Sequence, residues 1–305
     1  MNKKKVSIAL SVILAAGILP AGFIAFSMGG INIGGYSDNT SPKTVQQTRQ
    51  PSPLTVNDLP QSKKQPKKVI DTKGIKISKE IEDYLRTAGG SNAEKNIENY
   101  KKLLAEFNVP DKYKNEIEKL FKKGYKVSDV LTAYDFLYGN YGQIDELGML
   151  VDKNEGSKDW SKVFKEYNSS NKEFVPRNFE SGYLEKLMNT PGIMADDVMI
   201  SDRLSQKGIR SFEELISSRK LGRNWKDIKT ELGVINTEDK LPRVSVSKSQ
   251  VEKFVKDNGL EEKTVENTLI LAGKLGEDDD LAIKKVKEGC GAEDIYAQFY
   301  SKKYR

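Results

Sequence analysis

The stretch GRNWKDIKTELG, from Gly222 to Gly233, contains the pattern that decides the fold of this chain. Its first glycine is followed by Trp225, Ile228 and Leu232. Trp225 and Leu232 stand three residues before and four residues after Ile228, and such positions share one face of an α-helix. The stretch therefore predicts a tight turn at Gly222 and then an amphipathic helix whose apolar side packs against a neighbour.

The same pattern recurs from Gly124 onward and forms an internal repeat. Five copies have a glycine six residues ahead of a Val or Ile, and in a sixth copy the spacing is seven. The pairs are Gly124 and Val130, Gly156 and Val163, Gly192 and Val198, Gly222 and Ile228, Gly259 and Val265, and Gly289 and Ile295. Every second glycine returns after about 67 residues. Trp160 and Trp225 occupy equivalent positions, so we expect both to be packing residues.

The residues around each glycine carry the signals for the end of one helix and the start of the next. Basic residues precede the glycine in FKKG (121–124) and RKLG (219–222), as is favoured in the last turn of a helix that ends at glycine. An aspartate directly precedes the Val or Ile in four copies, where its charge stabilises a first helical turn. These residues are Asp129, Asp197, Asp227 and Asp294. Each copy thus predicts a helix end, a turn and a helix start.

The repeat predicts an all-α fold made of an array of helical hairpins, either a short α-solenoid or a compact helical bundle. Amphipathic helices are expected before the repeat at 78–87 and 93–107, and a third begins at Pro110. Within the repeat we expect helices at 128–138, 143–153, 159–167, 181–188, 195–206, 211–220, 224–232, 247–257, 262–273, 278–287 and 292–302. The one strand-like stretch, 243–246, is too short to found a sheet.

The composition excludes several kinds of site. The chain has 305 residues, no histidine and one cysteine, Cys290. It therefore has no Ser-His-Asp or Cys-His nucleophile system, no zinc site built from His and Cys, and no intrachain disulfide. We expect no cofactor and no metal ion. Cys290 is interpreted as a spare small residue, with a link between two chains as the alternative.

The N-terminus carries the clearest functional signal. Lys3, Lys4 and Lys5 precede an uncharged, mostly apolar stretch of twenty-three residues at 6–28. About twenty apolar residues cross the hydrocarbon core of a membrane, whereas the apolar region of a cleavable signal has roughly seven to fifteen. The length favours a signal anchor at 1–28 that forms a single transmembrane helix. A cleaved signal peptide is the alternative, since Pro20 interrupts the run. In both cases the positive-inside rule places the remainder outside the cell membrane.

A linker is expected to separate this segment from the helical domain. Residues 29–74 contain five of the ten prolines and a basic run at 63–68, without helical period. Such a stretch buries too little apolar surface to offset the entropy of ordering, so we expect a disordered Pro/Lys/Gln-rich linker. The all-α repeat domain then occupies 75–305, with N-terminal helices at 75–123 and repeats at 124–305.

Two resemblances concern the segment quoted first. Residues 222–234 resemble the first helix and the turn of helix-turn-helix proteins, in which a groove-reading helix follows directly. Here INTEDKLP (235–242) follows, with acidic residues and a helix-breaking proline, so we expect no nucleic-acid partner.

The repeat also resembles a helical repeat of uncharacterised bacterial proteins, of the type Gly-x-x-Trp-x-x-Ile-x-x-x-Leu-Gly after a Lys-rich helix. This resemblance covers 124–305, departs from the type at Asp202 and Glu262, and implies no known activity.

Two further groups of residues have a structural and a functional interpretation. The acidic run from Glu277 to Asp280 could hold calcium, but it lacks the spaced oxygens and the closing glutamate of a calcium loop, so helix N-capping is preferred. Tyr134, Tyr138 and Tyr141 could stack on a sugar. Because Tyr134 belongs to the repeat stripe, core packing is preferred there.

Two classes of function follow. The first is a non-catalytic, membrane-tethered and extracytoplasmic module that binds an unknown protein or cell-envelope partner. The alternative is a cell-wall-active enzyme that uses paired carboxylates, since catalysis by Glu and Asp needs no histidine. Such an enzyme requires two facing acids about 5 to 10 Å apart in a cleft. The sequence contains no catalytic motif, and we therefore expect the interaction module.

Overall fold

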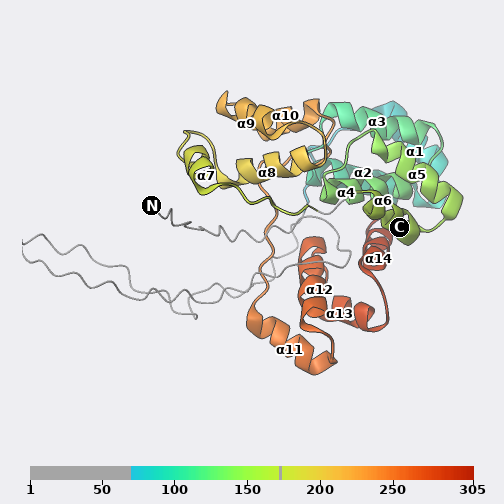
Figure 1. Ribbon diagram of the computed structural model, residues 1–305. Helices are drawn as coiled ribbons and strands as arrows, with labels where there is room; N and C mark the ends of the chain where they lie inside the picture. The colour runs from blue at the N-terminus through green and yellow to red at the C-terminus, as the bar shows by residue number, and fades with distance from the viewer. Residues whose placement is uncertain (1–69, 172–173) are drawn as a thin grey trace, which may run out of the picture.

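The computed structural model describes residues 70–171 and 174–305, and within these residues the chain forms fourteen α-helices (Figure 1). They are α1 (Lys79–Gly89), α2 (Ala93–Glu106), α3 (Asp111–Lys122), α4 (Val127–Asn140), α5 (Glu146–Ser157), α6 (Trp160–Ser170), α7 (Ser181–Met188), α8 (Ala195–Gln206), α9 (Phe212–Lys220), α10 (Trp225–Glu231), α11 (Lys248–Asn258), α12 (Glu262–Leu275), α13 (Asp279–Lys287) and α14 (Ala292–Tyr304). A short 3-10 helix, η2 (Gly90–Asn92), links α1 to α2. The only β-type pairing in these residues is an isolated bridge between Gln143 and Val234. The all-α prediction is thus confirmed for the described residues, and the expected helix ranges agree to within a few residues.

The expected membrane segment at 6–28 and the linker up to residue 69 lie outside the described residues. The helices at 70–171 and 174–305 include none with the length and apolar character needed to span a bilayer.

Five of the six repeat glycines adopt the left-handed backbone conformation that ends a helix and that other residues avoid. The φ angles are +91° at Gly124, +79° at Gly192, +79° at Gly222, +66° at Gly259 and +91° at Gly289. Gly156 differs from this expectation because it lies inside α5, and the left-handed residue of that turn is Lys158, with φ 55°. The copy with the longer spacing therefore has its turn two residues later.

In every copy, the helix after the turn begins three residues before the Val or Ile of the repeat. The first helical residues are Val127, Trp160, Ala195, Trp225, Glu262 and Ala292. The Val or Ile has at most 3% of its surface exposed in all six copies. Full burial of such a side chain stabilises the fold by about 1.5–3 kcal/mol. The repeat pattern is therefore the seam along which the helices pack.

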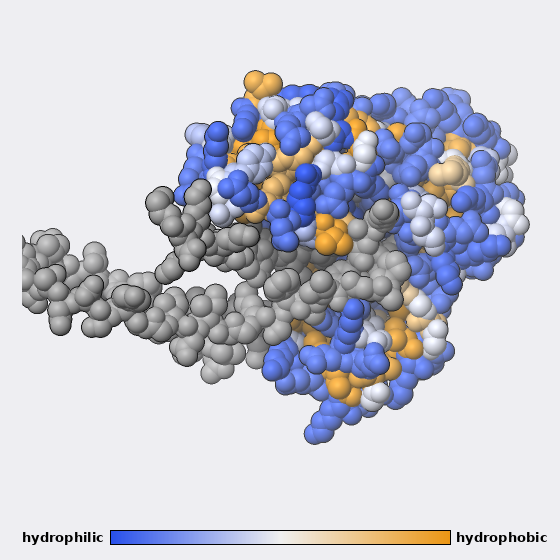
Figure 2. Space-filling model, in the orientation of Figure 1, coloured by the Kyte–Doolittle hydropathy of each residue, from blue (hydrophilic) through white to orange (hydrophobic). Residues whose placement is uncertain are grey.

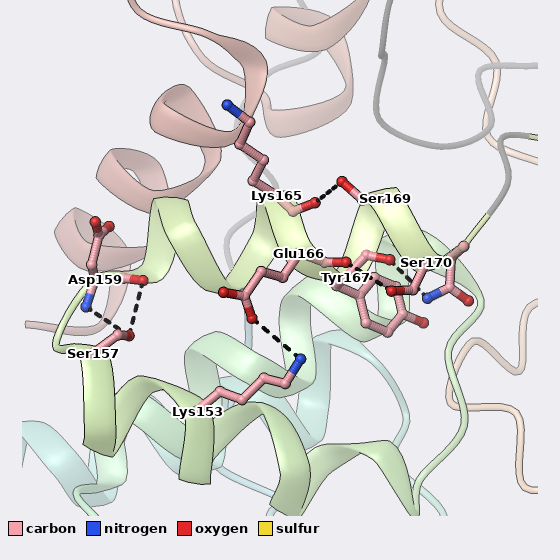
Figure 3. A network of polar contacts seen from close by, with 9 residues as sticks. Lys153, Ser157, Asp159, Lys165, Glu166, Tyr167, Ser169 and Ser170 are labelled. Atoms are coloured by element: carbon pink, nitrogen blue, oxygen red, sulfur yellow. Dashed lines mark hydrogen bonds and ion pairs between the residues drawn. The ribbon is translucent and has the colours of Figure 1, made fainter.

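The hairpin of α5 and α6 illustrates how polar residues close one unit (Figure 3). Lys153 and Glu166 form an ion pair between the two helices, with 3.3 Å between Nζ and Oε2. At the turn, the Ser157 hydroxyl accepts a hydrogen bond from the backbone N–H of Asp159. The Asp159 carboxylate in turn accepts from the N–H of Lys162 at 3.2 Å and caps α6. These contacts are exposed, so they fix the turn more than they add stability.

The helices pack in three groups. The N-terminal bundle consists of α1 to α6 together with α14. The α7–α10 lobe buries its apolar side chains in two separate clusters. The α11–α13 lobe has a small core around Phe254 and Val265. Figure 1 shows α9 and α10 at the top of the view and α11 and α13 at the bottom, so the two lobes project in different directions.

The last helix does not continue a linear stack. Helix α13 packs against α12, whereas α14 returns to the N-terminal bundle and packs against α6 and α4. Tyr296 and Tyr300 of α14 meet Phe136 and Phe164 edge to face, with ring centroids 6.3 and 6.2 Å apart. This return closes the bundle, and the arrangement differs from an open solenoid in that respect.

A short backbone contact joins the α7–α10 lobe to the N-terminal bundle. The N–H of Ile144, just before α5, donates to the carbonyl of Gly233 at 2.8 Å. The hydroxyl of Tyr113 in α3 donates to the carbonyl of Val234 at 3.0 Å. The backbone carbonyl groups that follow α10 thus accept hydrogen bonds from residues of the bundle, and these bonds fix the position of the lobe relative to the bundle.

Candidate interaction surface

The residues of the repeat lie in the interior. Trp160 and Trp225 are buried, as are Val or Ile in all six copies. Asp202, one of the two departures from the repeat type, is also buried and forms an ion pair with Arg177. Glu262, the other departure, is exposed at the start of α12. The repeated positions therefore specify packing, and a binding surface has to be sought among residues that differ between copies.

Two of the repeat aspartates accept a hydrogen bond from the tryptophan of the following unit. The indole N–H of Trp160 donates to Asp129 Oδ1 at 3.2 Å, and that of Trp225 donates to Asp197 Oδ1 at 2.7 Å. The two pairs are related by the longer period of about 67 residues. The sequence indicated only that these aspartates favour helix N-termini. Their role as acceptors for a buried indole depends on the packing of two hairpins.

Asp197 joins three helix ends of the α7–α10 lobe, a group that we call the Asp197 cluster. Its Oδ2 accepts from the backbone N–H of Met194 at 2.8 Å, at the start of α8. Its Oδ1 accepts from Nε of Arg219, in the last turn of α9, at 2.8 Å. The indole of Trp225 starts α10. A buried carboxylate is costly without such partners, so the cluster holds these helix ends together.

Two large apolar side chains stand exposed beside this cluster, and we call them the lobe tip. Leu221 directly follows α9 and has 82% of its surface exposed, and Met194 at the N-cap of α8 has 65% exposed. The Asp197 cluster brings them to the same end of the lobe, since Met194 N–H and Arg219 Nε bind one carboxylate.

Comparison among the repeats shows that an apolar residue is unusual at both tip positions. The residue directly before the repeat glycine, where Leu221 stands, is elsewhere Lys123, Glu155, Pro191, Asn258 or Glu288. The residue at the N-cap, where Met194 stands, is elsewhere Lys126, Asp159, Asn224, Glu261 or Gly291. The turn does not need an apolar side chain at either position. Met194 belongs to the copy of Gly192 and Leu221 to the copy of Gly222, so each position carries an exposed large apolar side chain in one copy, which the turn itself does not require.

Exposed apolar side chains are concentrated on this lobe more generally. Among the described residues, seven large apolar side chains are exposed, and five of them lie between 175 and 221. These five are Val175, Tyr183, Met188, Met194 and Leu221. Figure 2 shows apolar surface over the part of the molecule that contains α8 to α10 and also over the part that contains α11 to α13, amid mostly hydrophilic surface. The lobe is thus the part of the described chain that exposes most of its large apolar side chains.

A shallow, open depression of about 550 Å³ lies at the opposite end of α8 and α9. It is lined by Val175, Arg177, Ser205, Gln206, Phe212 and Glu213. Arg177 is already engaged, because its side chain pairs with Asp202 and lies 5.0 Å from the centre of the Phe212 ring. The depression offers apolar contact area but has no enclosed polar pocket for a small ligand.

Three cationic side chains meet in the closed interior between the lobe and the bundle. The guanidinium of Arg203 lies 4.0 Å from the centre of the Tyr141 ring, and Nζ of Lys229 lies 4.9 Å from it. Burial lowers the pKa of Lys229 to about 7 and that of Lys207 to about 8, and the charge of Arg203 adds to both effects. Lys229 Nζ donates to the carbonyl of Glu238 at 2.6 Å. Arg203 and Lys229 are buried and Lys207 is partly exposed, so the cluster lies at the contact between the lobe and the bundle.

The other candidates from the sequence have structural roles in the described residues. Asp278 caps α13 by accepting from the N–H groups of Asp280 and Leu281, as the N-capping interpretation proposed. No group of acidic or sulfur ligands within 70–171 and 174–305 is placed to hold a metal ion. Of the three tyrosines considered for sugar stacking, Tyr134 and Tyr141 are buried and Tyr138 donates to Glu238 at 3.3 Å.

Three more expectations can be compared with the geometry. Cys290 is half-buried, and its sulfur lies 3.6 Å from Gln298 Nε2. After α10 the chain forms no helix until Lys248, so the second helix of a helix-turn-helix unit does not follow there. The enzyme alternative concerns paired carboxylates, and the buried carboxylates in the described residues each pair with a cation. These carboxylates are Asp135, Asp197 and Asp202.

Compared with protein-family models, curated proteins and solved structures, the chain gives no significant match.

Proposed function

We propose that this protein is a membrane-tethered, extracytoplasmic helical module that is not an enzyme and that binds a protein or cell-envelope partner through its α7–α10 lobe. The anchor in this proposal is the apolar segment at 6–28, and the linker at 29–74 carries the helical domain away from the bilayer.

The observation that carries the proposal is the concentration of exposed apolar side chains on one lobe. Five of the seven exposed large apolar residues lie between 175 and 221, although this stretch is a minor part of the described chain. Apolar side chains of this kind are buried when a partner binds, and the release of water from them favours association. The N-terminal bundle and the α11–α13 lobe contribute only Met149 and Leu281 to the same set.

The location of the domain can be tested with single cysteines in a Cys290→Ser background, which otherwise has no thiol. Ser91 is exposed in η2, and Asn2 precedes the three lysines of the N-terminus. A membrane-impermeant maleimide applied to intact cells should label Ser91→Cys, whereas Asn2→Cys should react only after lysis. Labelling of Ser91→Cys only after lysis would show that the domain is inside the cell and would overturn the proposal.

Binding by the lobe can be tested with a photoreactive phenylalanine analogue at Tyr183, which is exposed on α7. Illumination of intact cells should give a discrete cross-linked product from this position. The matched control is the same residue at Lys263, which is exposed on α12. Equal cross-linking at both positions, or at neither, would contradict a binding role for the lobe.

A further inference from the structure

We propose that the lobe tip, Met194 and Leu221, inserts into the headgroup region of an anionic lipid bilayer, with Lys220 and Lys226 placed on the lipid phosphates. This inference rests on the proposed function, because it names the envelope component that one end of the α7–α10 lobe contacts.

The geometry of the tip suits shallow insertion. Leu221 and Met194 project from turns at the ends of α9 and α8, and the Asp197 cluster holds these turns against each other. An apolar side chain on a rigid turn enters the interface without any cost of ordering the turn. Both residues occupy positions at which the other copies have glycine, proline or polar residues, so the fold itself does not account for them.

The charges around the tip match a negatively charged surface. The nearby acids Asp196 and Asp197 are paired with Arg243 and Arg219 at 3.0 and 2.8 Å. Within the described residues, the exposed Lys220 and Lys226 form no ion pair. A lysine close to an anionic bilayer contributes about 1 kcal/mol to binding.

One exposed acid also lies in this segment. Asp227 accepts from Asn224 Nδ2 at 2.7 Å and lies in the first turn of α10, where the helix dipole stabilises its charge. Arg223 and Glu231 neutralise each other, with 2.6 Å between Nη2 and Oε2. Three exposed side chains in this segment have no ionic partner in the described part of the chain, namely Lys220, Lys226 and Asp227. Their two positive charges and one negative charge give a net charge of +1.

The length of the N-terminal chain places the tip within reach of the bilayer. About 46 residues separate Met28 from Ile75, and an unstructured chain of that length spans about 35–40 Å on average. A domain of the size described here has a radius of gyration of about 17 Å. With the proposed anchor at 6–28, a tether of that length would exceed the domain radius, so the tip could reach the membrane.

The experiment uses the full chain with Leu221→Cys in the Cys290→Ser background and an environment-sensitive bimane on residue 221. The protein is reconstituted into vesicles of phosphatidylcholine, alone or mixed with phosphatidylglycerol, whose acyl chains carry bromine as a quencher. We expect quenching and a blue shift in the mixed vesicles, and a several-fold weaker effect in phosphatidylcholine alone. Added salt should reduce the effect, because it screens exposed charges.

Charge-reversed variants test the role of the lysines. Lys220→Glu with Lys226→Glu should weaken insertion by at least fivefold per charge, the factor that corresponds to about 1 kcal/mol. The matched control reverses Lys263 and Lys287, two exposed lysines of the α11–α13 lobe, and should leave the signal unchanged. A bimane on Leu281→Cys, at an exposed apolar residue of α13, should remain in water.

The outcomes separate this inference from the proposed function. If the chain sediments with the vesicles but the label on residue 221 stays in water, the inference fails and the tethered module stands. If the chain does not associate with the vesicles at all, both fail. A label that is already shielded before vesicles are added shows that a second copy covers the tip, and shielding only by an added envelope protein fraction assigns the tip to a protein. Either result overturns insertion into lipid.

Discussion

The hydroxyl of Tyr304 donates a hydrogen bond to Asp135 Oδ2 at 2.8 Å and so ties the penultimate residue of the chain to the middle of α4. Lys303 reaches the same oxygen at 2.8 Å, and Asn99 of α2 donates to the backbone carbonyl of Tyr304 at 3.1 Å. All of these groups are buried or partly buried. The last turn of α14 is therefore part of the core of the N-terminal bundle.

Substitution of Tyr304 should show how much of the stability of the bundle depends on this end. Tyr304→Ala removes a buried ring and is expected to lower the free energy of unfolding by about 3–5 kcal/mol. Tyr304→Phe removes only the hydroxyl and should cost about 1–2 kcal/mol, since Asp135 keeps its contact with Lys303. Urea denaturation followed by circular dichroism measures both. Equal costs for the two variants would contradict this assignment.

The two tryptophan–aspartate pairs should differ in strength. Trp225→Phe leaves the buried Asp197 without its indole donor, and we expect a loss of about 2–4 kcal/mol from the unpaired group and the lost volume. Trp160→Phe should cost less, because Asp129 is more exposed and its bond is longer, at 3.2 Å. The denaturation midpoints of the two variants give the order. A larger effect at Trp160 would show that the Asp197 cluster is not a stabilising element.

The repeat glycines provide a matched pair of substitutions. An alanine Cβ would have open space at both Gly124 and Gly156, so only the backbone distinguishes them. Gly124 has φ +91°, and Gly124→Ala should destabilise the protein by about 1 kcal/mol or more. Gly156 lies inside α5, and Gly156→Ala should stabilise it by about 0.5–1 kcal/mol. Thermal unfolding should therefore shift in opposite directions, and shifts of the same sign would contradict the turn assignment.

The buried Lys229 should make the free energy of unfolding rise with pH between about 7 and 10.5. Its pKa is lowered to about 7 by burial and by the charge of Arg203, with Glu238 and Asp239 opposing the effect, whereas its ordinary value is 10.5. The unfolded chain binds this proton more tightly, so the contribution of Lys229 to stability improves as the pH rises from about 7 toward 10.5, by up to about 1.4 kcal/mol per pH unit.

Lys229→Met should remove the Lys229 contribution, because methionine has no proton to lose, whereas the contribution of Lys207, whose pKa burial lowers to about 8, remains. The free energy of unfolding, measured at pH 7 and pH 9, should rise for the natural chain relative to the variant. Lys226→Met, at an exposed position three residues earlier, is the control and should run parallel to the natural chain. If the free energy of unfolding changed equally with pH in all three proteins, Lys229 would remain charged between the lobe and the bundle.

The helices could be predicted closely because their signals are local. The positive φ at Gly222 and the burial of Ile228 follow from the spacing of residues within one turn of helix. The failure at Gly156 has the same origin, since a glycine next to a helix end is tolerated inside the helix when the next residues can continue it. Lys158 then takes the left-handed position at a modest cost.

The arrangement of the helices could not be predicted in this way. The period of 67 residues suggests equal units in a row, but α14 leaves the row because its Tyr296 and Tyr300 find an aromatic core in α4 and α6. Contacts between residues so distant in sequence leave no spacing signal. The tip residues Met194 and Leu221 were missed for a related reason. A search for agreement among repeats overlooks the positions at which one copy disagrees, and Met194 and Leu221 are exposed positions of this kind.

The return of α14 has a consequence for biosynthesis. The N-terminal bundle lacks one of its helices until translation has passed residue 304. Phe136 and Phe164 therefore have no contact with Tyr296 and Tyr300 while the intervening lobes are synthesised. A chain that ends before α14 therefore leaves Phe136 and Phe164 without the edge-to-face contacts of Tyr296 and Tyr300.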